Sequence, residues 1–135
     1  MRAATLGVVV ALVFMTSCVN RLPDQDLRIR TAAPVAKMSA ADLWQDYQND
    51  ARGADGRYWG RAVEISGPLT ASDVSDPAAP SLLFTQASGR GVRARLLDED
   101  APAILKAAVV GQRVRLVCFC EGLSGDVILK SCILK

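Results

Sequence analysis

Residues 112–134, QRVRLVCFCEGLSGDVILKSCIL, decide the fold, because they read as two long strands joined by a glycine-containing turn. The first strand covers Gln112–Cys120, the turn covers Gly122–Gly125, and the second strand covers Asp126–Leu134. Apolar residues occupy every second position of the first strand: Val114, Leu116, Cys118 and Cys120. A period of two predicts a strand with one face buried.

Three further strands are predicted upstream of this hairpin. Arg61–Leu69 alternates, Ser81–Gln86 is a second apolar run, and Val92–Leu96 alternates with arginines. Ala71–Pro80 separates the first two strands as a loop. A short helix begins at Asp98–Asp100, whose carboxylates suit a helix N-terminus. We therefore expect a mainly β domain with helices (α+β), in the order β-β-β-α-β-β of an OB-fold, a five-stranded Greek-key barrel.

A helix is predicted before the first of these strands. Ser39 suits an N-cap, and Leu43 and Tyr47 follow at helical spacing. Gly53 begins a pair of glycines that we expect to end the helix. Trp44 and Tyr47 are interpreted as core residues of this helix rather than as a ligand-stacking pair.

The N-terminus has the pattern of an export signal. Ala3–Met15 is an uncharged run that would span about 20 Å as a helix, too short for a bilayer core of about 30 Å. Small residues then precede Cys18, and Met15-Thr16-Ser17-Cys18 resembles the lipobox of bacterial lipoproteins. We predict a signal peptide over residues 1–17, a lipidated tether over 18–37 and a domain over 38–135.

The lipobox resemblance implies acylation of Cys18, including a palmitate-type chain, and anchoring to a cell membrane or outer membrane. The domain would face the periplasm or the exterior. Two chains give stable anchoring, since each buried CH₂ contributes about 0.8 kcal/mol. The alternatives are an ordinary secretory signal with an unmodified Cys18, or an uncut signal anchor.

Composition restricts the chemistry. The chain has no histidine, which removes the commonest general base and the usual partner of a nucleophilic Ser or Cys. We therefore expect no enzymatic activity, no cofactor and no metal site. The net charge of +2 falls to 15 − 14 = +1 when residues 1–17 are removed, too small to require a polyanionic partner.

A ligand-binding face is predicted where OB-folds bind, on strands two and three and the adjacent loops. Phe84, Arg90, Arg93 and Arg95 belong to that region, and we expect Arg113 and Arg115 nearby. Such a face could meet an acidic envelope protein, a glycan or a lipid headgroup; the alternative is a solvated arginine face that only keeps the domain soluble. Single-stranded nucleic acid is the second candidate, disfavoured because few aromatic residues are available for base stacking.

Three cysteines remain in the domain: Cys118, Cys120 and Cys132. An exported compartment permits a disulfide. Cys132 is the natural partner on the neighbouring strand, and the turn decides between the other two. A turn centred near residue 125 would favour Cys118, whereas a bulge by Gly122 would favour Cys120.

Several short segments, in order, resemble the tRNA-anticodon-like OB-fold family of bacterial lipoproteins. They are SAADL (39–43), YQN (47–49), YWGRAVEISG (58–67), GQRV (111–114), and Cys120-Glu121-Gly122 followed by Cys132-Ile133. The resemblance covers residues 38–135 and implies the OB-fold; no catalytic residue is carried over from it. It also implies a Cys120–Cys132 disulfide, with Cys118 as the alternative partner.

Overall fold

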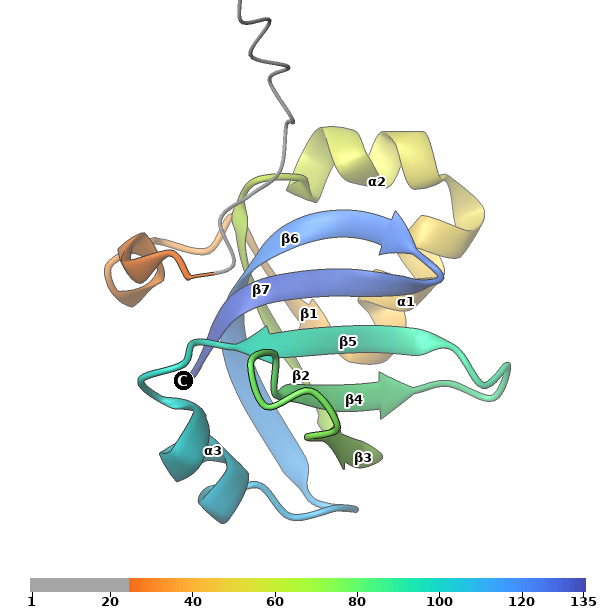
Figure 1. Ribbon diagram of the computed structural model, residues 1–135. Helices are drawn as coiled ribbons and strands as arrows, with labels where there is room; N and C mark the ends of the chain where they lie inside the picture. Colours follow the sequence, from red (N-terminus) through yellow and green to blue (C-terminus); the bar gives the residue numbers. More distant parts are fainter. Residues whose placement is uncertain (1–24) are drawn as a thin grey trace, which may run out of the picture.

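The computed structural model describes residues 25–135, in which seven strands form one sheet in the order β1-β2-β6-β7-β5-β4-β3. The strands are β1 (Ala36–Ser39), β2 (Ala62–Pro68), β3 (Ala71–Asp73), β4 (Ser81–Thr85), β5 (Gly91–Leu96), β6 (Arg113–Ser124) and β7 (Asp126–Leu134). The helices are the 3₁₀-helix η1 (Leu27–Arg30) and the α-helices α1 (Ala40–Asn49), α2 (Ala51–Tyr58) and α3 (Ala101–Ala107). Figure 1 shows the sheet coiling around a core, with α1 and α2 on one side and α3 at one end.

The predicted hairpin is present and forms the centre of the sheet. β6 and β7 pair antiparallel, and β7 also pairs parallel with β5. The turn is tighter than predicted, because β6 continues to Ser124 and only Gly125, at φ 73°, separates it from β7. A left-handed conformation of this kind favours glycine.

The fold is mixed α+β and OB-like, but the prediction of a five-stranded closed barrel is wrong in strand count and closure. The first predicted strand, Arg61–Leu69, is present as β2, whereas the predicted loop Ala71–Pro80 begins with the short strand β3. β2 pairs with β6, whereas β3 pairs with β4 at the far end of the sheet. The chain at Leu69–Thr70 thus links β2 to β3, the strand at the opposite edge of the coiled sheet, and β1 adds an unpredicted parallel strand beside β2.

The N-terminal helix begins as predicted and continues further. The Ser39 hydroxyl accepts a hydrogen bond from the Asp42 N–H at 3.0 Å. The helix is interrupted at Asp50, whose carboxylate accepts from the Gly53 N–H at 3.0 Å and starts α2. The expectation that the glycines end the helix is wrong: a Cβ at Gly53 would collide with the Asp50 carboxylate, so glycine is what makes this cap fit.

The core fills the inside of the coiled sheet. Tyr47 and Leu43 are fully buried in it, and Trp44 packs against its edge, which confirms the interpretation of these residues as core. The side chains that alternate along β4, β5 and β6 point into the same cluster: Leu82, Phe84, Val92, Ala94, Leu96, Val114, Leu116, Cys118 and Cys120.

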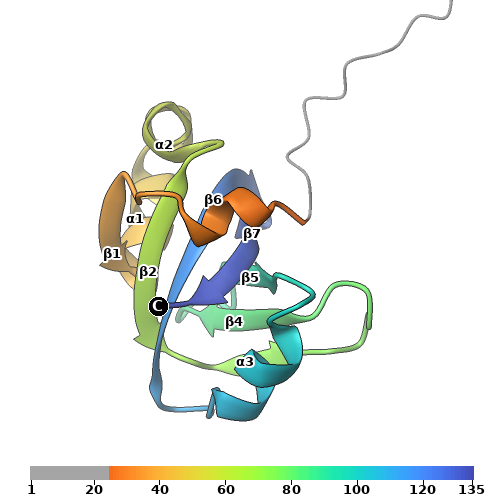
Figure 2. The ribbon, with the colours of Figure 1, turned by 90° about the vertical axis from the view of Figure 1, so that its left-hand side faces the viewer.

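A second, smaller apolar cluster lies on the outside of the sheet under η1. Figure 2 shows η1, in orange, beside β6 and β7. Ile29 is only 2% exposed and packs with Ala62, Leu97 and Val117. The Asp26 N–H donates to the Ser131 hydroxyl at 2.9 Å. The predicted tether is therefore wrong for residues 26–37, which belong to the folded domain. The predicted signal peptide, Cys18 and residues 18–24 lie outside the described residues.

Candidate ligand-binding face

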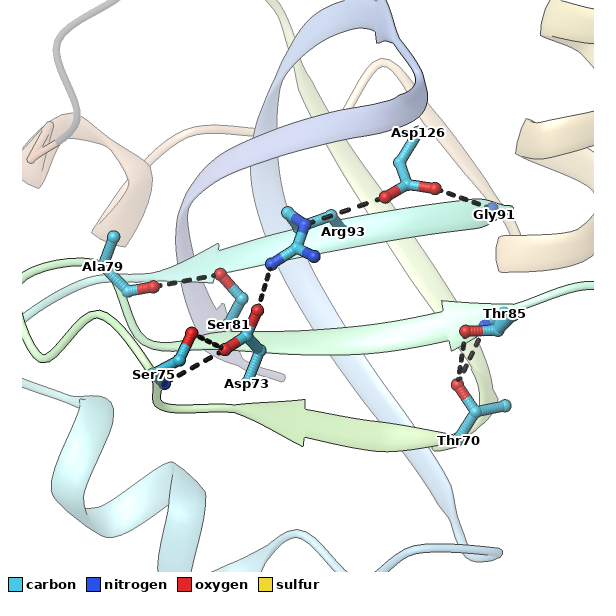
Figure 3. Close-up of polar contacts among 9 residues, drawn as sticks. All are labelled: Thr70, Asp73, Ser75, Ala79, Ser81, Thr85, Gly91, Arg93 and Asp126. Carbon is cyan, nitrogen blue, oxygen red and sulfur yellow. Dashed lines mark hydrogen bonds and ion pairs between the residues drawn. The ribbon is translucent and has the colours of Figure 1, made fainter. Parts of the chain in front are cut away.

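The outer surface of β3, β4, β5 and β7 carries a network of polar side chains, drawn in Figure 3. Arg93 of β5 lies at its centre. Its Nη1 donates to Asp73 Oδ2 at 2.9 Å, and its Nε lies 3.7 Å from Asp126 Oδ2. The other oxygen of Asp126 accepts from the Gly91 N–H at 3.1 Å. Arg93 is thus held between carboxylates from β3 and β7, the strands on either side of the β4–β5 pair. Arg93, Asp73 and Asp126 are here called the Arg93 clamp.

Asp73 is itself fixed by the loop that follows it. Both the backbone N–H of Ser75, at 3.0 Å, and its hydroxyl, at 2.6 Å, donate to Asp73 Oδ1. The Ser75 hydroxyl first, and Arg93 second, hold the pKa of Asp73 well below its usual range. The carboxylate therefore stays ionised and the ion pair stays formed in moderately acidic solution.

The short strand β3 is also secured at its start. The Thr70 hydroxyl donates to the Leu83 carbonyl at 2.6 Å and accepts from the Thr85 N–H at 2.9 Å. Figure 3 shows the contacts between Thr70 and Thr85. Thr70 lies at the point where the chain passes from β2 to β3. These hydrogen bonds position Asp73 opposite Ser81 on β4.

Next to the Arg93 clamp lies a polar hollow of about 250 Å³. It is lined by Arg95, Glu121, Ser124, Ile128 and Lys130. The Lys130 ammonium lies 2.6 Å from Glu121 Oε2, and the Lys130 side chain is only 6% exposed. A charge this buried requires a partner of opposite sign, which Glu121 supplies.

The sequence placed two of its four candidate residues correctly on this face. Arg93 and Arg95 point outward from β5, half-buried. Arg90 is exposed in the β4–β5 turn, next to Gly125 of the β6–β7 turn. Phe84 does not lie on this outer face: it is 1% exposed and lies in the core, because the inward positions of β4 are Leu82 and Phe84.

The acidic partners were missed by sequence reasoning, although the pattern held a signal for them. Asp126, Ile128 and Lys130 alternate along β7 and so share the outer face with Arg93. The place of Asp73 on this face could not be predicted, because the sequence predicts a loop over Ala71–Pro80.

The disulfide joins Cys118 to Cys132, so the implied Cys120–Cys132 pairing is wrong and the alternative partner is the one used. The register of β6 and β7 is irregular between Val117 and Phe119 and again between Cys120 and Gly122. Cys120 consequently lies opposite Leu129, which leaves Cys118 beside Cys132.

Cys120 is a buried free thiol. Its Sγ lies 3.4 Å from the Tyr47 hydroxyl, which donates to Asp55 Oδ1 at 2.8 Å. Burial raises the pKa of Cys120 and that of Tyr47. A thiol kept protonated and enclosed is a poor nucleophile.

Comparison with known proteins gives the family. The family model described as tRNA_anti-like matches residues 2–133. The chain belongs to the tRNA_anti-like family. A crystal structure of a "putative nucleic acid-binding lipoprotein" from Klebsiella pneumoniae subsp. pneumoniae MGH 78578 is similar to this domain at a TM-score of 0.58 and 13% identity, covering 82% of this chain and 97% of the other. Among curated proteins, no sequence matches the chain.

The face of this tRNA_anti-like domain is balanced in charge. Three cations (Arg93, Arg95 and Lys130) lie among three carboxylates (Asp73, Glu121 and Asp126). No aromatic side chain belongs to either the Arg93 clamp or the polar hollow as the described residues form them. Such a surface offers fixed hydrogen-bond donors and acceptors rather than a positive field with stacking platforms.

Residues 25–135 contain no group of three or more His, Cys, Asp or Glu residues arranged to hold a metal ion. No helix in this part of the chain combines the length and the apolar character that crossing a bilayer requires.

Proposed function

We propose that the protein is a cell-envelope lipoprotein, anchored through a lipid on Cys18, whose tRNA_anti-like domain is a non-catalytic binding module. The uncharged run Ala3–Met15 followed by Cys18 supports the anchor. The Klebsiella lipoprotein with the same fold supports it independently. The domain would face the periplasm or the exterior.

The Arg93 clamp is the observation that carries the binding role. Arg93 is held between Asp73 and Asp126, and Lys130 against Glu121, so the charges of this face are fixed in direction and neutralised in sum. Paired charges at an interface give orientation and specificity more than long-range attraction. This favours an envelope protein or a glycan, which present donors and acceptors of both kinds, over a polyanion.

Absence of catalysis is part of the proposal. The chain lacks histidine, and two carboxylates of the face are engaged with Arg93. The thiol that could act as a nucleophile, Cys120, is buried beside Tyr47. Nothing on this face pairs a free base with an accessible nucleophile, which general acid–base and covalent catalysis both need.

The anchor is tested by metabolic labelling of cells with a radioactive fatty acid. Wild type should carry label and sediment with membranes, whereas Cys18→Ser should carry none and be released or left unprocessed. Cys120→Ser is the matched control and should label like wild type, because its position lies inside the domain. Wild type without label would refute the anchor.

The binding face is tested by photo-crosslinking in intact cells. A photoreactive residue at Leu83, which pairs with Arg93 on this face, should give a discrete adduct. The same residue at Gln48, exposed on α1, is the control and should give none. Arg93→Ala should weaken the Leu83 adduct at least roughly tenfold, as truncation of a hot-spot arginine does. Equal adducts at both positions, or none at Leu83, would refute the assignment of this face.

Single-stranded nucleic acid is the second candidate, favoured by the description of the Klebsiella neighbour. It predicts oligonucleotide binding whose affinity falls steeply as salt is raised. A titration of the purified lipoprotein with a labelled oligonucleotide at low salt decides it. Binding that disappears in Arg93→Ala would move the proposed ligand from an envelope protein or glycan to nucleic acid.

A further inference from the structure

A second surface, here called the basic hollow, lies away from the Arg93 clamp where β6 begins and β7 ends. It has a volume of about 360 Å³. Its charged lining residues are Arg113, Arg115 and Lys135, and none of the side chains that line it is acidic. The rest of the lining is aliphatic: Ala107, Ala108, Val114 and Leu134.

The cations of the basic hollow differ from those of the Arg93 clamp because they are unpaired. Among residues 25–135, no Asp or Glu carboxylate lies within ion-pair distance of Arg113, Arg115 or Lys135. Arg113 donates to the Ser66 hydroxyl at 3.3 Å, a neutral partner. Three cationic residues thus line one open hollow that has no acidic side chain in its lining, which makes the hollow an attractive site for an anion.

An exposed apolar turn adjoins the basic hollow. Residues 109–112, here called the valine turn, are closed by a hydrogen bond from the Gln112 N–H to the Val109 carbonyl at 3.0 Å, with Gly111 at φ 89°. The Gly111 N–H donates to the Leu69 carbonyl at 2.8 Å, which fixes the turn to the sheet. Val110 at its tip is 62% exposed. Val109 and Leu134 are also exposed, so aliphatic groups lie beside the unpaired cations.

We propose that the basic hollow and the valine turn together dock the domain on the surface of an anionic phospholipid bilayer. The guanidinium and ammonium groups would contact lipid phosphates, and the valines would enter the headgroup boundary. Basic residues near an anionic leaflet are attracted to it, and exposed aliphatic groups add burial at the interface. The inference rests on the proposed function, because the lipid on Cys18 brings the domain to the bilayer.

The path of the chain agrees with this orientation. The N-terminal segment is fastened to β7 by the bond from Asp26 to Ser131. Lys135 comes four residues after Ser131, at the end of β7. At the rise of a strand, the two residues are about 13 Å apart. The segment leading to Cys18 and the basic hollow are therefore close enough to meet one membrane surface together.

Nucleic acid fits this surface less well than lipid. No aromatic side chain lines the basic hollow in the described part of the chain, and base stacking needs such platforms. The exposed neighbours are Val109, Val110 and Leu134, which suit a lipid boundary.

The experiment uses the full lipidated protein mixed with vesicles of phosphatidylcholine alone or with added phosphatidylglycerol. An environment-sensitive dye is attached through Val110→Cys, which is selective because Cys120 is buried and Cys118 is bonded to Cys132. The dye should shift to the blue only with phosphatidylglycerol. A dye attached through Ser88→Cys, in the exposed β4–β5 turn, is the control and should respond to neither vesicle.

Charge variants test the basic hollow itself. Arg113→Gln with Arg115→Gln should reduce the response of the dye at least roughly tenfold, and raised salt should have the same effect. Arg52→Gln with Arg61→Gln removes the same charge from exposed positions elsewhere and should leave the response unchanged.

Flotation of the same samples separates the two proposals. A chain that floats with both vesicles while the dye at position 110 does not respond would overturn the docking surface and keep the anchor. A chain that floats only with phosphatidylglycerol would overturn the anchor and keep the docking surface. Oligonucleotide binding that needs Arg113 and Arg115, without any vesicle response, would assign the basic hollow to nucleic acid and overturn the proposal.

Discussion

At the scale of single residues, three inward-pointing cysteines have two different roles. Cys118 and Cys132 are bonded and fully buried, whereas Cys120 is a buried thiol beside the Tyr47 hydroxyl. The bond closes a loop with a sequence separation of 14. Cross-linking a loop of about this length contributes about 3 kcal/mol in the chain-entropy model. Such a contribution is large beside the roughly 5–15 kcal/mol by which native domains are stable.

Replacing Cys132 by alanine should lower the free energy of unfolding by about 3 kcal/mol and the melting temperature by about 10 °C or more. The measurement is thermal unfolding with and without a reducing agent. Cys120→Ala should retain the sensitivity to reduction, because the Cys118–Cys132 bond survives. Loss of that sensitivity in Cys120→Ala would instead place Cys120 in the disulfide.

Asp73 should make stability depend on pH below about pH 4. Its pKa is lowered in the folded state by Ser75 and Arg93, so the ionised form favours folding. That contribution is fully present above the usual aspartate pKa of about 3.9 and is lost as pH falls toward the lowered value. Asp73→Asn should therefore lose less melting temperature between pH 5 and pH 2 than wild type. A parallel decline in both proteins would contradict the clamp.

At the scale of elements, η1 is the least expected part of the fold. It covers the outer surface of the sheet through Ile29, and Arg30 pairs with Asp100 at 2.7 Å and Glu99 at 3.1 Å. η1 also separates the basic hollow from the polar hollow. Val117 lies beneath η1, between Arg115 of the basic hollow and Glu121 of the polar hollow on the outer face of β6. An element without helical periodicity thus becomes part of the domain by burying a single large side chain.

Ile29→Ala should lower the free energy of unfolding by about 2–5 kcal/mol, since it removes a fully buried side chain. Leu27→Ala is the matched control in the same segment: Leu27 is 54% exposed, and its removal should change stability by less than about 0.5 kcal/mol. Urea unfolding measures both. Equal and small effects would mean that η1 does not stabilise the sheet.

The elements that the sequence predicted well are those with a clear period. β5, β6, β7 and α3 were all placed within a few residues, because Val92–Leu96 and Val114–Cys120 alternate and Asp98–Asp100 suits a helix start. Elements defined by pairing were not found. β3 has three residues and no pattern of its own; it exists because Thr70 bonds Leu83 and Thr85.

The sequence predicted only those residues of the candidate site whose outward position follows from the alternation of their own strand. The positions of Arg93 and Arg95 followed from the period of β5. The ion pair of Arg93 with Asp73 depends on β3, a strand that no pattern in the sequence predicts. Phe84 was misplaced because an aromatic residue near a binding face was given a surface role, although its own strand alternation points it inward.

At the scale of the whole molecule, two surfaces of the domain differ in how their cations are paired. The face around Arg93 has paired cations, and the basic hollow around Arg113 has unpaired ones. The two apolar clusters are nevertheless joined, since Ala62 and Val63 are neighbours on β2 but belong to different clusters. Both clusters should therefore unfold together.

We expect a single cooperative transition in calorimetry, with equal calorimetric and van't Hoff enthalpies. Hydrogen exchange offers a local check: the amides of Leu97, in the outer cluster, and Ile65, in the main core, should open with similar free energies. A second transition, or much earlier exchange at Leu97, would show that the outer cluster is a separate unit.

The packing of Ile29 onto the sheet limits how far the domain can lie from a lipid on Cys18. Because Asp26 and Ile29 are held by the domain, only residues 19–24 separate Cys18 from the first described residue, Gln25. Seven residue steps, fully extended, cover about 25 Å. With an acyl chain on Cys18, the domain would stay in a thin layer of the envelope next to the bilayer that holds it. Any partner would have to enter that layer to be bound.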